Sequence, residues 1–175
     1  MSTSSLSLAE LGGLDERRFV GALGSVFEHS PWIAEAAWRR RPFGSVAELH
    51  AALELAMREA PRERQLELIL AHPELAGREA RQRTLTPESS DEQASAGLDR
   101  LTAEELEALR RLNSAYRERF GFPLIICVRE HNKDSIIAWG VARLAHSREE
   151  EIEIALGEIT KIARLRLADV VEDAS

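Results

Sequence analysis

Residues 72–99 read HPELAGREARQRTLTPESSDEQASAGLD, and they separate two groups of segments with strong helical patterns. The stretch is poor in large apolar residues although it lies mid-chain, and it holds a His-Pro step and a cluster of Ser, Asp, Glu and Gln. A segment that adds little to a core yet interrupts a patterned chain is usually functional. We therefore expect functional residues to concentrate here.

The segments before this stretch predict short helices with apolar faces. Asp15 suits an N-cap, and SVAE (residues 45–48) has the spacing of a capping box. A helix that opens at Pro61 carries several large apolar residues up to His72. Because Pro73 pushes the residue before it out of the helical region, we expect this helix to end at His72.

The segments after the stretch predict longer helices. Capping boxes at TAEE (102–105) and SREE (147–150) each open a helix, and Gly121 is a C-terminal signal for the first. Residues 134–145 predict a helix between them, and the last helix is expected to end near Val171.

The run FPLIICV (122–128) is apolar and rich in β-branched residues, which is typical of a strand. A single strand would have no partner, so we expect a buried extended segment or a short helix. The pattern as a whole predicts about eight helices and no sheet, an all-α single-domain bundle over residues 15–175. Residues 1–14 are expected to form an N-terminal arm with leucines able to dock on the bundle.

Composition narrows the functional classes. A chain of 175 residues fits one domain, and its net charge of −7 argues against nucleic acid or an anionic membrane surface as the main partner. No run approaches the roughly 18 apolar residues of a membrane span, and neither a secretory nor a peroxisomal signal is recognisable. The single Cys127 cannot form an internal disulfide and lies among apolar residues, so we expect a buried thiol in a reducing, cytoplasmic setting.

The last predicted helix contains an arginine on its apolar face. Residues 152, 156, 159, 163, 166 and 170 follow one another at alternating spacings of four and three, and Arg166 is the charged member of that stripe. Burial of an unpaired guanidinium is costly, so either a carboxylate or an anionic ligand should face it. The alternative is that Arg166 reaches the rim or pairs with a purely structural acid.

His72 lies on the same side of its helix as Leu68 and Ile69, at the C-terminus, where the carbonyl dipoles favour an imidazolium. That arrangement suits a proton donor near neutral pH, although a lone histidine beside an apolar face is more often structural. The other histidines lack the partner spacing of a metal site. We therefore expect no metal.

The cluster SSDEQ (89–93) has the form of a helix start with Ser90 as N-cap and Gln93 three residues on. Capping alone would explain these residue types. The same helix start would also offer main-chain N–H groups and side-chain donors to an anionic or ureido group. Glu92 in its first turn could hold the imidazole of His72 in one orientation.

Four motifs in this order resemble the OHCU decarboxylases, which act on 2-oxo-4-hydroxy-4-carboxy-5-ureidoimidazoline in urate degradation. They are AHPELAG, SSDEQASAGLD, LNSAYRERFGFPLIICVR and EITKIARLRLADVV, and they extend the resemblance from about Phe19 to Val171. The resemblance implies an all-helical, usually homodimeric carboxy-lyase that needs no cofactor and yields (S)-allantoin.

The resemblance also assigns site residues. It places the catalytic histidine at His72 and its carboxylate partner at Glu92. The substrate contacts that follow from the resemblance, together with the donor expected from the helix start, are Pro73, Ser89, Ser90, Gln93, Arg166 and the main chain of Leu124, Ile125, Ile126, Cys127 and Val128.

Two other functions fit the same residues. One is a non-catalytic helical module that binds an anionic small molecule or a partner helix through Arg166 and the Ser90 helix start. The other is a different acid/base lyase or hydrolase acting on a related ureide. Substitution of His72 separates the first from an enzyme, because a binding module would keep its function.

Overall fold

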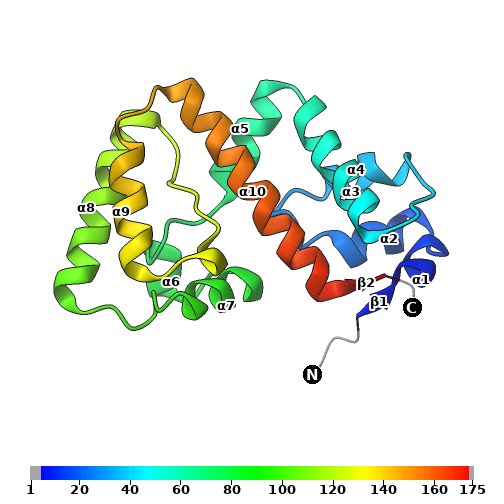
Figure 1. Cartoon of the computed structure of the whole chain (residues 1–175), viewed down its shortest axis with the longest axis horizontal. Coiled ribbons are helices and arrows are strands. Elements are labelled where there is room, and N and C mark those ends of the chain that lie inside the picture. Colours follow the sequence, from blue (N-terminus) through cyan, green and yellow to red (C-terminus); the bar gives the residue numbers. More distant parts are fainter. Residues whose placement is uncertain (1–4, 174–175) are drawn as a thin grey trace. The chain divides into compact units, whose positions relative to one another are not determined.

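The structure is a computed structural model in which residues 5–173 are described (Figure 1). The described chain contains ten α-helices, one 3-10 helix and a pair of two-residue strands, which confirms the predicted all-α class. Residues 1–4 of the expected N-terminal arm and 174–175 lie outside the described residues. The elements in chain order are β1 (Leu6–Ser7), α1 (Leu8–Gly12), α2 (Glu16–Leu23), α3 (Trp32–Trp38), α4 (Val46–Glu59), α5 (Arg62–Ala71), α6 (Arg78–Gln82), α7 (Pro87–Ser95), α8 (Ala103–Phe120), η1 (Val128–Glu130), α9 (Lys133–Arg143), α10 (Arg148–Val170) and β2 (Val171–Glu172).

Helix boundaries follow the local capping chemistry. α8 begins at a full capping box, in which the Thr102 hydroxyl accepts from the Glu105 N–H at 3.2 Å and the Glu105 carboxylate accepts from the Thr102 N–H at 2.9 Å. Ser147 and Glu150 exchange the same two bonds at the start of α10. Asp15 caps α2 by accepting from the N–H of Arg18. These starts agree with the sequence patterns.

The chain forms two compact units. The N-terminal unit comprises residues 5–71 and 160–173, and the central unit comprises residues 72–159. In the N-terminal unit, α2 packs on α3 and α3 on α4, while β1 and β2 pair in parallel with Leu6 opposite Val171. Figure 1 shows the blue β1 beside the red β2. Leu8 and Leu11 of α1 are buried, so these two leucines of the expected arm are core residues.

The central unit is organised around α8, which packs against α9. Residues 122–127 between these helices belong to no helix or strand, and every residue from Phe122 to Val128 is buried. This is the buried irregular segment that the apolar run predicted. We call residues 122–128 the buried segment.

One helix end depends on backbone freedom. Gly121 ends α8 with a φ of 81°, in the left-handed region that disfavours a side chain. Gly157 lies inside α10, and a Cβ built at either glycine meets no described heavy atom within 4 Å. The two positions therefore differ in backbone conformation and not in available space.

We predict opposite signs for two alanine substitutions. Gly121→Ala should lower the free energy of unfolding by about 1 kcal/mol, because alanine is strained in the left-handed region. Gly157→Ala should raise it by about 0.5–1 kcal/mol, because alanine loses less backbone entropy in a helix. Urea denaturation followed by circular dichroism measures both, and equal effects of the two changes would contradict this account of Gly121.

Candidate active site

His72 directly follows the last residue of α5, Ala71, as the proline after it predicts. The imidazole-bearing residue is 8% exposed, and Pro73 is half-buried. Leu68 and Ile69, the residues four and three positions earlier, are fully buried. The predicted placement of His72 on the apolar side of its helix end is therefore confirmed.

The predicted start of α7 is wrong. The N-cap is Thr86, whose hydroxyl accepts from the Ser89 N–H at 3.3 Å, and Pro87 occupies the first turn. The Ser90 N–H donates to the Thr86 carbonyl at 2.9 Å within the helix. The backbone N–H groups from Ser90 onward are thus used by helical bonds and do not form an anion site. Glu92 lies in the second turn, not the first.

α7 presents two different faces. Ser89 and Gln93, four residues apart, are buried on one face, while Ser90 is exposed. Ser90 and Gln93 both line a cavity of about 450 Å³, together with residues that include Arg81 and Arg83. Glu92 is half-buried. The residues predicted from one cluster are therefore distributed around the helix.

The loop after Pro73 is fixed by two buried amide side chains. Gln93 accepts from the Ala76 N–H through Oε1 at 2.8 Å, and Asn113 of α8 donates through Nδ2 to the Leu75 carbonyl at 3.0 Å. Ala76 has a φ of 47°, which is unusual for a residue with a side chain, so these bonds hold a strained turn. Gln93 thus connects α7 to the loop that begins at His72, and its amide NH2 group remains as a donor.

The buried segment lies next to α7, because α7 contacts η1, which begins at Val128. The central unit therefore brings together α7, the loop that follows His72 and the end of the buried segment. These are three of the predicted site regions. Side chains from α9 and α10 satisfy some of the main-chain groups of the buried segment.

Two charged side chains bind the main chain of the buried segment. Arg143 at the end of α9 donates through Nη1 to the Ile125 carbonyl at 2.5 Å. Glu158 of α10 accepts from the Cys127 N–H at 2.8 Å. Within residues 5–173 the N–H and C=O of Ile126 have no hydrogen-bond partner, although the residue is 2% exposed. Buried peptide groups are nearly always paired in proteins, so this peptide is a candidate to meet a ligand or water.

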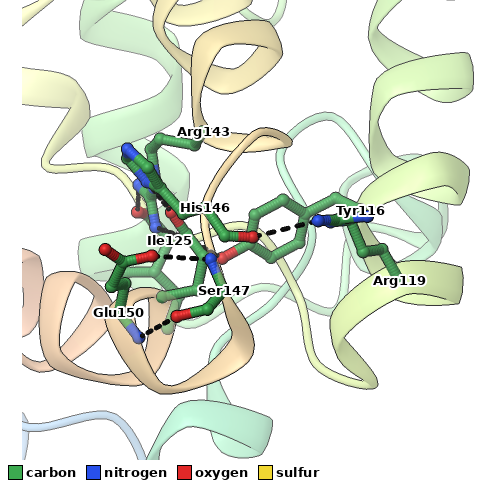
Figure 2. Close-up of polar contacts among 8 residues, drawn as sticks. Tyr116, Arg119, Ile125, Arg143, His146, Ser147 and Glu150 are labelled. Carbon is green, nitrogen blue, oxygen red and sulfur yellow. Dashed lines mark hydrogen bonds and ion pairs between the residues drawn. The ribbon is translucent and has the colours of Figure 1, made fainter.

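Arg143 belongs to a cluster of polar residues that we call the Glu151 cluster: Tyr116, Arg143, His146 and Glu151. Figure 2 labels Tyr116, Arg143 and His146 of this cluster. Arg143 donates through Nη2 and Nε to the Glu151 carboxylate at 2.7 and 3.0 Å, and the side chains of both are fully buried. The Tyr116 hydroxyl also donates to Glu151, and Nδ1 of His146 lies 2.8 Å from its Oε1.

The contacts within the Glu151 cluster shift the pKa values of two of its members, Glu151 and Tyr116. Burial disfavours ionisation of Glu151, but the hydrogen bonds from Arg143, Tyr116 and His146 outweigh it and hold the pKa of this carboxyl below its ordinary value. Burial, together with the hydrogen bond to Glu151, raises the pKa of the Tyr116 hydroxyl. The ground state is therefore a carboxylate bound to a guanidinium and a neutral phenol.

The sequence of α10 contains a helical stripe that includes Glu151. Glu151, Ala155, Glu158 and Ile162 follow one another at spacings of four, three and four, and all are buried. This is the same kind of stripe that identified Arg166. Glu151 sits beside the capping box of α10, so it resembles one more helix-start acid in the sequence.

Arg166 faces a carboxylate, as its buried position requires. Its Nη1 donates to Glu28 Oε2 at 2.8 Å and to the Ser25 carbonyl at 3.1 Å, and the side chains of Arg166 and Glu28 are 5% and 2% exposed. All three residues belong to the N-terminal unit. The expectation of a partner acid is confirmed, and Glu28 is a residue that sequence analysis missed.

Three further observations concern metal binding, membrane-spanning helices and the single cysteine. Within residues 5–173, no three His, Cys, Asp or Glu side chains gather in a way that could hold a metal ion. In the same part of the chain, no helix has both the length and the apolar character of a membrane span. Cys127 is buried and forms no disulfide.

Residues 13–168 match the protein family described as OHCU decarboxylase. The 2-oxo-4-hydroxy-4-carboxy-5-ureidoimidazoline decarboxylase of Haloferax volcanii is 46% identical over 164 residues, which cover 94% of this chain and 95% of that protein. The uric acid degradation bifunctional protein PucL of Bacillus subtilis is 41% identical over 167 residues, 95% of this chain and 33% of that protein. A crystal structure of (S)-allantoin synthase superposes with a TM-score of 0.77 at 29% identity, covering 95% of this chain and 54% of that one.

We predict that Glu151→Gln lowers stability in a pH-dependent way. At neutral pH the loss should be about 3 kcal/mol, because Arg143 stays buried without its carboxylate. The pKa of Glu151 is held below its ordinary value of 4.5, so its contribution is present above that value and is lost as the pH falls through the lowered pKa. The difference between wild type and variant should therefore narrow below about pH 4.5.

Urea denaturation at a series of pH values measures this difference. Glu150→Gln is the matched control, since Glu150 is the exposed neighbour on the same helix and glutamine also completes a capping box. The control should stay close to wild type at neutral pH. A gap between Glu151→Gln and wild type that does not change with pH would contradict the assignment of a buried carboxylate.

Proposed function

We propose that His72 is the proton donor of this chain, which belongs to the OHCU decarboxylase family. The chain is a carboxy-lyase that converts 2-oxo-4-hydroxy-4-carboxy-5-ureidoimidazoline to (S)-allantoin in urate degradation. The observation that carries the site proposal is the convergence, in the central unit, of α7, the loop that begins at His72 and the unpartnered peptide of Ile126.

Decarboxylation needs a place for the electron pair of the broken C–C bond. Loss of CO2 leaves electron density at the ring carbon, and this density delocalises into the adjacent C=N or carbonyl system of the substrate. Hydrogen-bond donors aimed at the atoms where charge develops lower the barrier, so the reaction needs no separate electron sink.

The main chain of the buried segment supplies such a donor in our proposal. The Ile126 N–H is held in a dry segment, where a hydrogen bond to developing charge is stronger than in water. Leu124, Ile125, Cys127 and Val128 complete the lining that the family resemblance implies. The resemblance also implies a substrate contact from Arg166.

The electron pair passes to the adjacent ring carbon that bears the ureido group, His72 delivers a proton to one face of that carbon, which sets the S configuration, and the 4-hydroxyl loses its proton to become the carbonyl of allantoin. Glu92 orients the imidazole in this proposal, as a carboxylate does in other histidine-based sites. The corrected start of α7 supports a side-chain role for Glu92, because its position in the second turn removes any need for it as a helix-start charge. Pro73, Ser89 and the NH2 group of Gln93 are the proposed neighbouring contacts.

We further propose a cytoplasmic homodimer that takes no cofactor. The cellular location rests on the single cysteine, which cannot form an internal disulfide and so fits a reducing compartment, and the dimer rests on family resemblance. Analytical ultracentrifugation at micromolar concentration tests the dimer directly, and a species of 19.5 kDa across the whole concentration range would contradict it.

We predict that His72→Gln reduces kcat/KM for decarboxylation by about 100-fold, the usual effect of losing a general acid. Urate oxidase and hydroxyisourate hydrolase generate the substrate from urate in the cuvette, and circular dichroism follows the formation of (S)-allantoin. His50→Gln is the matched control, because His50 is a half-buried histidine that binds the Thr160 carbonyl at 3.0 Å in the N-terminal unit.

The control variant should keep wild-type activity. If the wild-type protein forms no more (S)-allantoin than the spontaneous reaction, the decarboxylase function is wrong. If it is active and His72→Gln is equally active, the proton-donor role is wrong while the function stands.

A further inference from the structure

We propose that Arg143 and Glu151 are positioning residues for decarboxylation, which fix the Ile125 carbonyl and thereby aim the Ile126 peptide at the substrate. The proposal rests on the proposed role of the buried segment in the site. It assigns a task in the reaction to residues that contact no substrate themselves.

The buried segment cannot position its own peptide groups. A strand is held by its neighbours and a helix by its own bonds, but residues 123–127 have neither kind of pairing. A misplacement of about 1 Å in a catalytic group costs on the order of 100-fold in rate. Other side chains must therefore supply the rigidity of this segment.

Arg143 can supply this rigidity. Its guanidinium is fully buried and divides its donors, with Nη1 on the Ile125 carbonyl at 2.5 Å and Nη2 and Nε on Glu151. The planar fork fixes the angle between these partners, so Glu151 determines where the Ile125 carbonyl lies. Figure 2 shows Arg143, Tyr116 and His146 gathered beside Ile125.

Among residues 5–173, the segment's main-chain groups without a partner include those of Ile126 and those of Leu124, two residues earlier. Arg143 binds the carbonyl of residue 125 and Glu158 binds the N–H of residue 127. In an extended chain, groups two residues apart face one edge and those of the residue between them face the other. The Ile126 groups, which lack a partner in residues 5–173, are those of the residue between. The two charged side chains thus hold one edge and leave the opposite edge open.

The cost of burying charge explains why the other members of the Glu151 cluster surround Arg143. An arginine placed here to hold a carbonyl needs a counter-charge, and Glu151 needs hydrogen bonds for its oxygens. Tyr116 and His146 provide these bonds.

The test compares four enzymes in the coupled allantoin assay. Arg143→Lys keeps the charge beside Glu151, but one ammonium group cannot reproduce the planar fork. The triple variant Tyr116→Phe/Arg143→Met/Glu151→Met replaces the buried polar group by apolar side chains of similar size, a change that often preserves or raises stability. Arg148→Met is the control, because Arg148 donates to the Phe120 carbonyl at 3.1 Å, just before the segment.

Positioning predicts a split between kcat and KM. Per folded enzyme, kcat should fall by about 10–100-fold in Arg143→Lys and in the triple variant, with KM changed by less than about threefold. Arg148→Met should keep wild-type kcat. Thermal unfolding monitored by circular dichroism gives the folded fraction for each variant.

Several results would overturn the proposal. They are a folded triple variant or a folded Arg143→Lys with wild-type kcat, a kcat loss that only matches the unfolded fraction, and an equal loss in Arg148→Met. An inactive wild type would instead refute the decarboxylase function itself, so the two failures are distinguishable.

Discussion

The central constraint on this structure is the burial of a main-chain segment that has no secondary structure. Residues 122–128 connect α8 to η1 through the core of the central unit, where unpaired peptide groups are costly. The chain satisfies them with charged side chains from α9 and α10. Those charges are themselves buried, so each requires partners of its own, and the Glu151 cluster is the result.

α10 provides three buried charged side chains. Glu151, Glu158 and Arg166 all lie on inward positions of one helix, and each is at most 5% exposed. Glu151 and Glu158 serve the central unit, while Arg166 pairs with Glu28 in the N-terminal unit. Apolar residues in place of a buried ion pair are often as stable or more stable. Charge at Glu151 and Glu158 fits the positioning of the buried segment that we propose.

Sequence patterns predicted those parts of the structure that depend on neighbours in the chain. The capping box at Thr102, the end of α8 at Gly121 and the helix end before His72 all follow from contacts within a few residues. The predicted start of α7 was wrong because two helix-start signals overlap there. Thr86 followed by proline outcompetes Ser90, since proline suits the first turn and cannot donate from within a helix. Long-range partners were not accessible in this way: the stripe showed that Arg166 needs an acid, but only the folded chain shows that the acid is Glu28.

The corrected start of α7 changes where anionic charge can be stabilised. With the helix beginning at Pro87, the N–H groups of residues 90–93 are used by intrahelical bonds, and the dipole at that point is no longer directed at a ligand. In our proposal the donors come instead from the buried segment and from side chains. Gln93 of α7 anchors the turn after His72, and Glu92 has the proposed role of orienting the imidazole. The proposed acid, its orienting carboxylate and the proposed charge-stabilising donor then lie on three different pieces of chain, so the accuracy of such a site would depend on the buried bonds that hold those pieces in place.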